Sequence, residues 1–298
     1  MYKILEKQGF SPIIKLMVIE APKVAKKCQP GQFIILRTHA EGERIPLTIA
    51  DFDRQKGTVT IVFQEAGKTT RQLGTLEAGD CLQDFVGPLG TPSHIENFGT
   101  VVCVGGGVGV APVFPIARAL KAAGNHVIGI MGARTKELMF WEEQLREACS
   151  ELFVTTDDGS YARKGFVTDV LQDVIEERGK EQIAQVLAIG PQPMMRACCN
   201  LTREYGLKTI VSLNSLMVDG TGMCGCCRVT VGGQTKFVCV DGPEFDGHQV
   251  DFAELARRNA FFQAEEKLSA GRWEERRQNA GVRSSSGCGC GCGCGGER

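Results

Sequence analysis

The sequence predicts an antiparallel β-barrel, then a doubly wound α/β domain with a parallel sheet, a small cysteine-rich module and a C-terminal helix. Three observations support this fold class. Residues 1–98 contain short β-branched and aromatic runs separated by Gly, Pro and Asp. Residues 99–212 alternate strand-like and helix-like segments. Four cysteines then crowd between Cys224 and Cys239, in a stretch without helical periodicity.

The composition is that of an ordinary globular chain. With 298 residues and 43% hydrophobic content, it is long enough for about two domains with a real core. The net charge is −1, from 34 Lys+Arg and 35 Asp+Glu, which gives no electrostatic reason to expect nucleic acid or an anionic membrane as partner. No apolar run approaches the length of a membrane span, and the first residues do not read as a signal peptide. We therefore expect a cytoplasmic protein.

The first domain, residues 1–98, contains five runs that read as strands. They are FSPIIKLMVIEAP, GQFIILRT, IPLTIADF, GTVTIVFQEAG and DCLQDFVGPLG. Turn residues divide them at intervals of about ten to fifteen residues, which is typical of an antiparallel barrel or sandwich.

The second domain, residues 99–212, reads as strands that alternate with helices. TVVCV, HVIGIMGA, ELFVTT, QVLAIGP and KTIVSLN are strand-like, whereas PVFPIARALKAAG, FWEEQLREAC, GFVTDVLQDVIEERG and PMMRACCNLTREYG are helical. This alternation predicts a parallel sheet with helices on both faces.

The strongest motif of this domain is the turn GGGVGVAP. Gly105, Gly106, Gly107 and Gly109 follow a strand and precede a helix. Glycines let the backbone approach a pyrophosphate, and the start of the helix offers free N–H groups. The spacing is not the strict G-x-G-x-x-G pattern, so a tight turn without a ligand is the alternative interpretation. TTDDG and GPQPM also follow strands, at the end of a parallel sheet where ligands bind.

The cysteine-rich module, residues 213–250, carries the spacing of a plant-type iron–sulfur site, C-x₄-C-x₂-C…C. Cys224, Cys227 and Cys239 take the last three places, and Asp219 stands in the first. A carboxylate can ligate iron, so the pattern predicts a 2Fe–2S cluster with one oxygen ligand. Cys226 is the rival for that place. A zinc ribbon is the other alternative, although the second C-x₂-C knuckle is missing.

Two polar motifs lie in the barrel. RIPLT begins at Arg44, and GKTTRQL begins at Gly67. An Arg can grip a pyrophosphate, and a Thr hydroxyl can bond a flavin ring nitrogen. Gly67, Thr69 and Thr70 predict the start of a helix, with Thr70 as its N-cap. Taken alone, a solvated Arg and an ordinary helix cap explain these residues equally well.

The order of the motifs resembles the ferredoxin–NADP reductase superfamily of flavin reductases. The cysteine cluster behind the α/β domain, followed by DGPEF, is similar to the electron-transfer subunit of dihydroorotate dehydrogenase. It is more similar to the small subunits of NADH-dependent reduced ferredoxin:NADP⁺ oxidoreductase, also described as sulfide dehydrogenase β-subunits. Asp219 fits this second group and departs from the all-cysteine dihydroorotate group. The resemblance covers residues 1–265.

The resemblance implies FAD between the two domains, a nicotinamide nucleotide on the glycine turn, and the cluster in the module. NADH is preferred, because Asp157 and Asp158 would repel a 2′-phosphate, although Arg134 and Lys136 favour one. The implied flavin residues are Arg44, Pro46, Leu47, Thr48, Gly67, Thr69 and Thr70. The implied nucleotide residues are Gly105, Gly106, Gly107, Gly109, Gly132, Arg134, Asp157 and Gly190. The implied metal ligands are Asp219, Cys224, Cys227 and Cys239.

The resemblance further implies an oxidoreductase subunit with no catalytic side chain of its own. NADH would give a hydride to FAD, which would pass single electrons to the cluster. The electrons then need an acceptor, so the expected heterodimer partner is a larger, glutamate-synthase-like subunit that binds NADPH and ferredoxin. In that family the pair reduces NADP⁺ by flavin-based electron bifurcation. The alternatives are the electron-transfer subunit of an NAD-dependent dihydroorotate dehydrogenase and a zinc-binding interaction module on a reductase scaffold.

The C-terminal part reads as one or two helices over residues 251–280, followed by a Gly/Cys-rich tail over 281–298 that we expect to be disordered. The helical part carries apolar side chains among charges, and it packs either on a partner or on its own domain. The tail cysteines either share a soft metal ion or have no function. These cysteines are Cys288, Cys290, Cys292 and Cys294.

Overall fold

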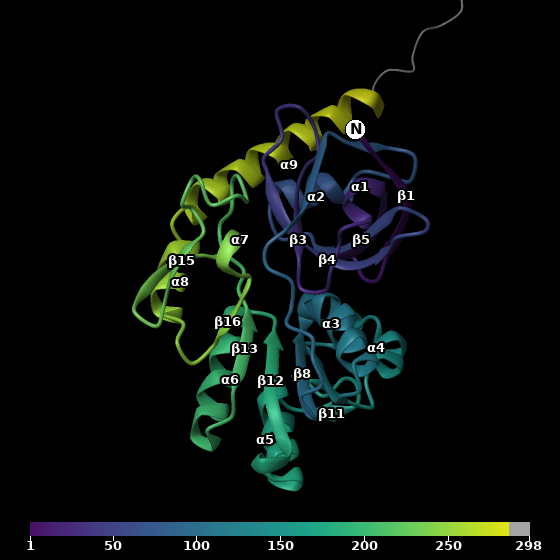
Figure 1. Cartoon of the computed structure of the whole chain (residues 1–298). Coiled ribbons are helices and arrows are strands. Elements are labelled where there is room, and N and C mark those ends of the chain that lie inside the picture. Colours follow the sequence, from purple (N-terminus) through teal and green to yellow (C-terminus); the bar gives the residue numbers. More distant parts are fainter. Residues whose placement is uncertain (286–298) are drawn as a thin grey trace, which may run out of the picture.

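The structure is a computed structural model that describes residues 1–285. Figure 1 shows the N-terminal barrel in purple and blue above the α/β domain in teal, with the cysteine-rich module in green beside both. The limits predicted for the domains remain predictions, but the order barrel, α/β domain, module and C-terminal helix is confirmed. The tail cysteines Cys288, Cys290, Cys292 and Cys294 lie outside the described residues.

The barrel is a seven-stranded sheet in the order β6-β1-β2-β5-β4-β3-β7. Every neighbouring pair is antiparallel, as predicted. Its strands are β1 (Tyr2–Gly9), β2 (Ile14–Glu20), β3 (Phe33–Arg37), β4 (Ile45–Asp53), β5 (Thr58–Gln64), β6 (Cys81–Leu82) and β7 (Asp84–Leu89). Two short helices, α1 (Pro22–Ala25) and α2 (Lys68–Gly74), lie between them in sequence.

The strand β2 is buried on both faces, because the barrel packs on the α/β domain. Met17 and Ile19 point into the barrel core, whereas Leu16 lies in a second cluster with residues of α3 (Val110–Ala122). This follows from the period of two along a strand. The exposed ion pair between Arg118 of α3 and Asp51 of β4, at 2.5 Å, lies at the edge of this domain contact.

The α/β domain has the parallel strand order β10-β9-β8-β12-β13, which is that of a doubly wound fold. Its strands are β8 (Thr100–Gly106), β9 (His126–Ala133), β10 (Glu151–Thr156), β11 (Arg163–Lys164), β12 (Ile183–Ile189) and β13 (Thr209–Ser212). Its helices besides α3 are α4 (Glu142–Ala148), α5 (Val167–Arg178), α6 (Gln192–Tyr205) and the 3₁₀ turns Gly107–Gly109, Lys136–Leu138 and Lys180–Gln182.

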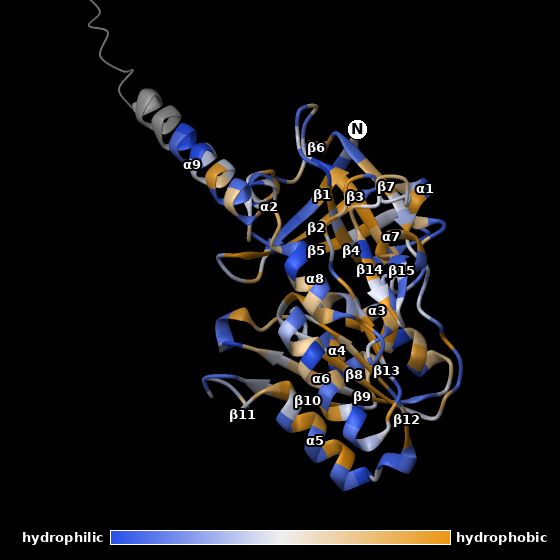
Figure 2. Ribbon diagram, turned by 90° about the vertical axis from the view of Figure 1, so that its left-hand side faces the viewer, coloured by the Kyte–Doolittle hydropathy of each residue, from blue (hydrophilic) through white to orange (hydrophobic). Residues whose placement is uncertain are grey.

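Alternate residues of the central strand β8 face opposite helix layers. Val101 and Cys103 pack with α3 and α4, and Val102 and Val104 pack with α5 and α6. In Figure 2 the central strands are mainly orange, and α5 shows blue and orange faces, as expected for a helix that covers a sheet. The switch in strand order lies between β8 and β12, so a crevice is expected at their carboxyl ends.

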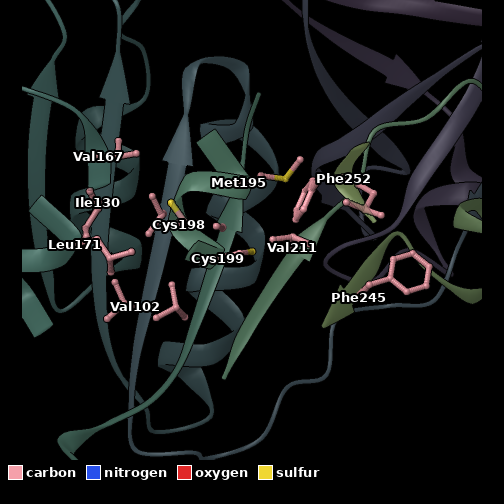
Figure 3. Close-up of a cluster of buried hydrophobic side chains, with 14 of the residues drawn as sticks. Val102, Ile130, Val167, Leu171, Met195, Cys198, Cys199, Val211, Phe245 and Phe252 are labelled. Atoms are coloured by element: carbon pink, nitrogen blue, oxygen red, sulfur yellow. The ribbon is translucent and has the colours of Figure 1, made fainter. Parts of the chain in front are cut away.

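The cysteine-rich module extends this same sheet. Its strand β16 (Glu244–Asp246) pairs antiparallel with β13 and forms the sheet edge. Before it come the hairpin β14 (Arg228–Val231) and β15 (Gln234–Phe237) and the short helix α7 (Val238–Asp241). Figure 3 shows Phe245 of β16 and Phe252 in one apolar cluster with Met195 and Val211 of the α/β domain. The module therefore shares a core with the nucleotide domain.

Two helices end the described chain, α8 (Phe252–Asn259) and α9 (Gln263–Ser285). Helix α9 runs beyond residue 280, where the sequence predicted the helical segment to end. It crosses from the module to α2 of the barrel (Figure 1), where Arg71 and Glu274 form an ion pair. Within residues 1–285, no helix combines the length and apolar character needed to cross a membrane.

The barrel, the linker between the two domains (residues 90–99) and the module meet at Gly31. Its backbone has a φ of +83°, and a Cβ there would lie 2.1 Å from Ser93 Oγ and 3.0 Å from Glu244 Oε1. Ser93 donates a hydrogen bond to Glu244, and the Ser93 N–H donates to Pro30 O. Only glycine fits this junction, because both the conformation and the contact exclude a side chain.

The linker between the two domains is held by the buried side chain of Asn125. Its Oδ1 accepts from the Phe98 N–H at 2.7 Å, and its Nδ2 donates to Glu96 O and Leu120 O. One buried side chain thus ties two backbone groups of the linker, the Phe98 N–H and Glu96 O, to the end of α3, where Leu120 O also accepts from the Asn125 N–H.

Replacing Asn125 by Ala should lower the free energy of unfolding by roughly 2–3 kcal/mol, because the side chain's three hydrogen bonds are lost and the Phe98 N–H and Glu96 O lose their side-chain partner. Urea unfolding of the full chain measures the change. Asn97→Ala is the matched control, since Asn97 is exposed and accepts one 3.2 Å bond. Equal effects of the two substitutions would contradict the role given to Asn125.

Candidate functional site

The residues predicted for the flavin lie along β4 and at the start of α2. Pro46, Leu47 and Thr48 are half-buried on β4, and they pair with β3. Arg44 directly precedes the strand and is exposed. The two segments are joined by Glu43, which forms an ion pair with Lys68 and accepts a hydrogen bond from Thr69 Oγ1 at 2.5 Å.

The start of α2 differs from the sequence prediction. Gly67, not Thr70, occupies the N-cap, in an extended conformation. Thr70 stands in the third helical position, where its hydroxyl accepts from the N–H groups of Ala66 and Gly67, both at 3.0 Å. The expectation failed because the Thr70 hydroxyl bonds back to the N-cap N–H, which is one half of a capping box, and Gly67 has no side chain to supply the other half.

Glu43 could not be identified from the sequence, since a lone Glu before a strand carries no signal. Burial raises the pKa of this carboxyl, but hydrogen bonds from Lys68 and Thr69 lower it below its ordinary value. The donors at the start of α2 thus already hold a carboxylate. They are complementary to an anion and fit the diphosphate of a flavin dinucleotide.

The glycine turn between β8 and α3 separates into packing glycines and one open glycine. A Cβ on Gly109 would lie 2.2 Å from Ile189 O, and one on Gly106 would lie 2.2 Å from Met194 Sδ. Gly105 and Gly190 are also crowded, by Val110 and by Met194. These glycines let the turn GGGVGVAP pack against the turn GPQPM, which joins the ends of β8 and β12.

Gly107 is the open position of this turn. It has a φ of +54°, and no atom lies within 4 Å of a Cβ built on it. The backbone here is uncovered at the start of α3, at the switch point of the sheet. This is where a pyrophosphate can approach N–H groups, so the turn fits a dinucleotide as well as close packing.

The ends of β9 and β10 lie beside the glycine turn, at the same edge of the sheet. Gly132 is explained by packing, because a Cβ there would lie 2.3 Å from Val167 Cγ1. Arg134 directly follows β9 and Asp157 directly follows β10, and the Asp157 N–H donates to Ala133 O at 3.0 Å. Burial raises the pKa of Asp157 above its ordinary value, although the charge of Arg134 opposes this.

The side chains beside Asp157 hold one another in place. Asp158 accepts hydrogen bonds from the Ser160 N–H and hydroxyl, at 2.9 and 2.7 Å. The Lys136 ammonium lies 5.4 Å from the centre of the Tyr161 ring. Lys136 is therefore engaged with an aromatic face, and acidic groups lie at the end of β10.

The predicted cluster ligands lie on the loop between β13 and β14 and on α7. Cys227 and Cys239 are buried, and their Sγ atoms are 3.2 Å apart. Asp219 Oδ2 accepts from the Cys224 N–H at 2.8 Å, and Oδ1 accepts from Thr221 N–H at 2.9 Å. The hydrogen bond from Thr221, with those from Cys224 and Met223, lowers the pKa of Asp219.

The four positions therefore form an outer pair, the half-buried Asp219 and the exposed Cys224, and a buried pair, Cys227 and Cys239. Within residues 1–285, no three ligand-type side chains converge on one point. A binuclear cluster divides its protein ligands between two irons, so two pairs fit it, whereas structural zinc needs four ligands on one ion.

The glycines of this loop bring it against the barrel. Gly220, Gly222 and Gly225 have positive φ angles, and a Cβ on Gly220 would lie 2.5 Å from Ile35 Cδ1 of β3. The loop therefore lies beside the barrel and is covalently continuous with the nucleotide domain. Cys226, the rival ligand, is half-buried and differs in this from Cys227.

Comparison with known proteins supports the same modules. Residues 103–200 match the oxidoreductase NAD-binding domain, and residues 214–251 match the iron–sulfur cluster binding domain of dihydroorotate dehydrogenase B. A Thermotoga maritima protein named as a homologue of the dihydroorotate dehydrogenase B electron-transfer subunit is 50% identical, over 86% of this chain and 89% of the relative. The electron-transfer subunit of Bacillus caldolyticus is 36% identical, over 74% of this chain and 86% of its own.

A solved structure is also similar over nearly the whole chain. It comes from a study of flavin-based electron bifurcation in NADH-dependent reduced ferredoxin-NADP oxidoreductase. The similarity has a TM-score of 0.87 and 47% identity, and it covers 92% of this chain and 98% of that one.

The barrel, the doubly wound sheet and the cysteine loop define a flavin and nicotinamide-nucleotide reductase of the ferredoxin–NADP reductase type with an iron–sulfur module. The chain belongs to the family of dihydroorotate dehydrogenase B electron-transfer subunits and their homologues. It is an oxidoreductase subunit whose cofactors are FAD, NAD(H) and an iron–sulfur cluster, and it acts with a larger partner subunit. The zinc-module alternative has no support from these matches.

The two kinds of glycine in the nucleotide turn should respond differently to alanine. Gly109→Ala should lower the melting temperature by roughly 5 °C, because its Cβ collides with a β12 carbonyl. Gly107→Ala should cost only about 1 kcal/mol of stability for its left-handed conformation, but it should weaken NADH binding by covering the open backbone. Thermal melts and NADH titration of the bound flavin measure both effects. Unchanged NADH affinity in Gly107→Ala would contradict a nucleotide at this turn.

Proposed function

We propose that this chain is the small subunit of an NADH-dependent reduced ferredoxin:NADP⁺ oxidoreductase that works by flavin-based electron bifurcation. The observation that carries the proposal is the cluster loop with Asp219 in the first ligand place, held against the barrel and joined to the nucleotide sheet. The 47% identity to a chain from the solved enzyme of that activity supports it.

The flavin site we propose runs from β4 to α2. Pro46, Leu47 and Thr48 would line the ring and ribityl chain, with Arg44 beside them. Gly67, Thr69 and Thr70 would hold the diphosphate end, where Glu43 now engages the same donors. Glu43 would have to turn away when FAD binds, because its carboxylate uses Lys68 and Thr69.

The nucleotide site we propose begins at Gly105–Gly109 and includes Gly190, Gly132, Arg134 and Asp157. The acidic ends of β10 disfavour a 2′-phosphate. Lys136, which could neutralise one, is folded over Tyr161. The arrangement therefore favours NADH over NADPH.

The ligand set we propose is the half-buried Asp219 and the exposed Cys224 on the outer side of the cluster, and Cys227 and Cys239 on the buried side. The 3.2 Å separation of the last two sulfurs supports their sharing one iron. Burial and the neighbouring Cys227 raise the pKa of Cys239 to about 12, so a bound iron would have to displace its proton.

Bound FAD would take a hydride from NADH and exchange single electrons with a 2Fe–2S cluster. The residues of this chain bind and orient these groups, and none of them needs to act as an acid or base. Electrons that reach the outer side of the cluster require a partner. We propose the larger, glutamate-synthase-like subunit that binds NADPH and ferredoxin, in a cytoplasmic heterodimer.

Dihydroorotate dehydrogenase electron transfer is the second candidate. The match of residues 214–251 to the cluster domain of that enzyme favours it, as do the named relatives. In this case electrons would flow from the partner to NAD⁺. Co-purification separates the two: a glutamate-synthase-like flavoprotein supports our proposal, and a dihydroorotate dehydrogenase partner overturns it.

Anaerobically purified protein tests the electron-transfer chemistry directly. We expect the visible spectrum of FAD with a 2Fe–2S cluster, bleached by stoichiometric NADH and at least tenfold more slowly by NADPH. A colourless sample that contains zinc, or a flavin that NADH does not reduce, would reject the proposed function.

Substitutions at the ligand positions test Asp219 against Cys226. Asp219→Ala should speed iron release to a chelator by roughly tenfold or more, since it removes one ligand. Asp219→Cys should retain the cluster with a shifted midpoint potential and an altered visible spectrum. Cys226→Ser is the matched control and should behave as the native chain. Rapid iron loss from Cys226→Ser, with a stable Asp219→Ala, would assign the fourth ligand to Cys226 instead.

A further inference from the structure

Two arginines outside the predicted ligand set hold consecutive carbonyl groups of the cluster loop. Arg228 Nη1 of β14 donates to Gly225 O at 3.0 Å, and Arg258 Nη2 of α8 donates to Cys226 O at 3.1 Å. The sequence gives no hint of this, because Arg258 lies beyond the module, among the charges of the C-terminal helix.

These contacts determine which way the loop amides face. In a trans peptide the C=O and the following N–H point in opposite directions. When Gly225 O turns toward Arg228, the Cys226 N–H turns away from that arginine. Likewise, when Cys226 O turns toward Arg258, the Cys227 N–H faces away from α8.

The charge of Arg258 has no counter-ion in the part of the chain that the structure describes. No carboxylate there lies within ion-pair distance of its guanidinium. Glu254, one turn earlier on α8, instead accepts from the Thr230 N–H at 2.9 Å. The Arg258 Nε is buried and has no hydrogen-bond partner. A half-buried guanidinium in this state is costly, so a function is expected for it.

We propose that Arg258 is a positioning residue of the iron–sulfur site: it orients the peptide between Cys226 and Cys227 and supplies positive charge beside the cluster. Arg228 assists from the exposed side. This inference rests on the proposed function, because it needs a cluster on this loop. An iron–sulfur cluster with anionic ligands is negative and becomes more so on reduction, so a nearby cation and inward-facing N–H groups raise its potential.

The test is an EPR-monitored redox titration of the full chain loaded with FAD and iron. Arg258→Gln removes the charge and should move the midpoint potential to more negative values. The expected change is on the order of tenfold in the one-electron equilibrium, or about 59 mV. Arg258→Lys keeps the positive charge but lacks the planar guanidinium group, and it should give a smaller shift of the midpoint potential in the same direction. Arg257→Gln is the matched control, since Arg257 is exposed on the same helix.

Equal potentials in Arg258→Gln and Arg257→Gln would overturn the inference. If Arg258→Gln retained no iron, the rate of iron release to a chelator from Arg258→Lys, compared with Arg257→Lys, would decide. A faster rate supports positioning by Arg258, and equal rates overturn it. A native chain without any 2Fe–2S EPR signal would reject the proposed function. A normal 2Fe–2S signal whose midpoint potential does not change in the Arg258 variants would reject this inference alone.

Discussion

The pairing of β16 with β13 is the constraint on which the arrangement of the proposed sites depends. This short antiparallel contact attaches the cysteine module to the nucleotide sheet, and Phe245 buries itself in the core of that sheet. The loop that precedes it must then pass beside the barrel, where Gly220 contacts Ile35. A single parallel sheet with one added edge strand thereby brings three binding regions together. No separate domain is required for the cluster loop.

The nucleotide domain shows why its architecture could be predicted from the sequence. Strand and helix runs in TVVCV and PVFPIARALKAAG differ in period, and each side chain of β8 packs as that period requires. The spacing of the predicted cluster ligands could also be recognised in the sequence, because iron–sulfur sites require their ligands at fixed intervals along the chain. The predicted sites lie where strands end or loops turn, which local patterns can locate.

What could not be predicted depends on contacts between distant segments. Glu43 engages the start of α2, and Arg258 engages Cys226, and neither residue stands in a recognisable motif. Thr70 has the right chemistry for a cap, yet it occupies the third helical position, because Gly67 already starts the helix. Gly132 stays a predicted nucleotide residue, and the sequence could not show that contact with Val167 also excludes a side chain there. Local sequence identifies candidate chemistry, and tertiary contacts decide which atoms remain free for it.

The junction at Gly31 gives the barrel a fixed stopping point against the module. A side chain there would collide with Ser93, and relieving the collision would move the barrel loop away from Ser93 and Glu244, and with it the proposed flavin site away from the proposed cluster site. The rate of electron tunnelling falls exponentially with distance. A side chain too small to unfold the protein would therefore still slow electron transfer between the proposed flavin and the proposed cluster. The missing side chain at Gly31 thus helps set the distance between the proposed flavin and cluster sites.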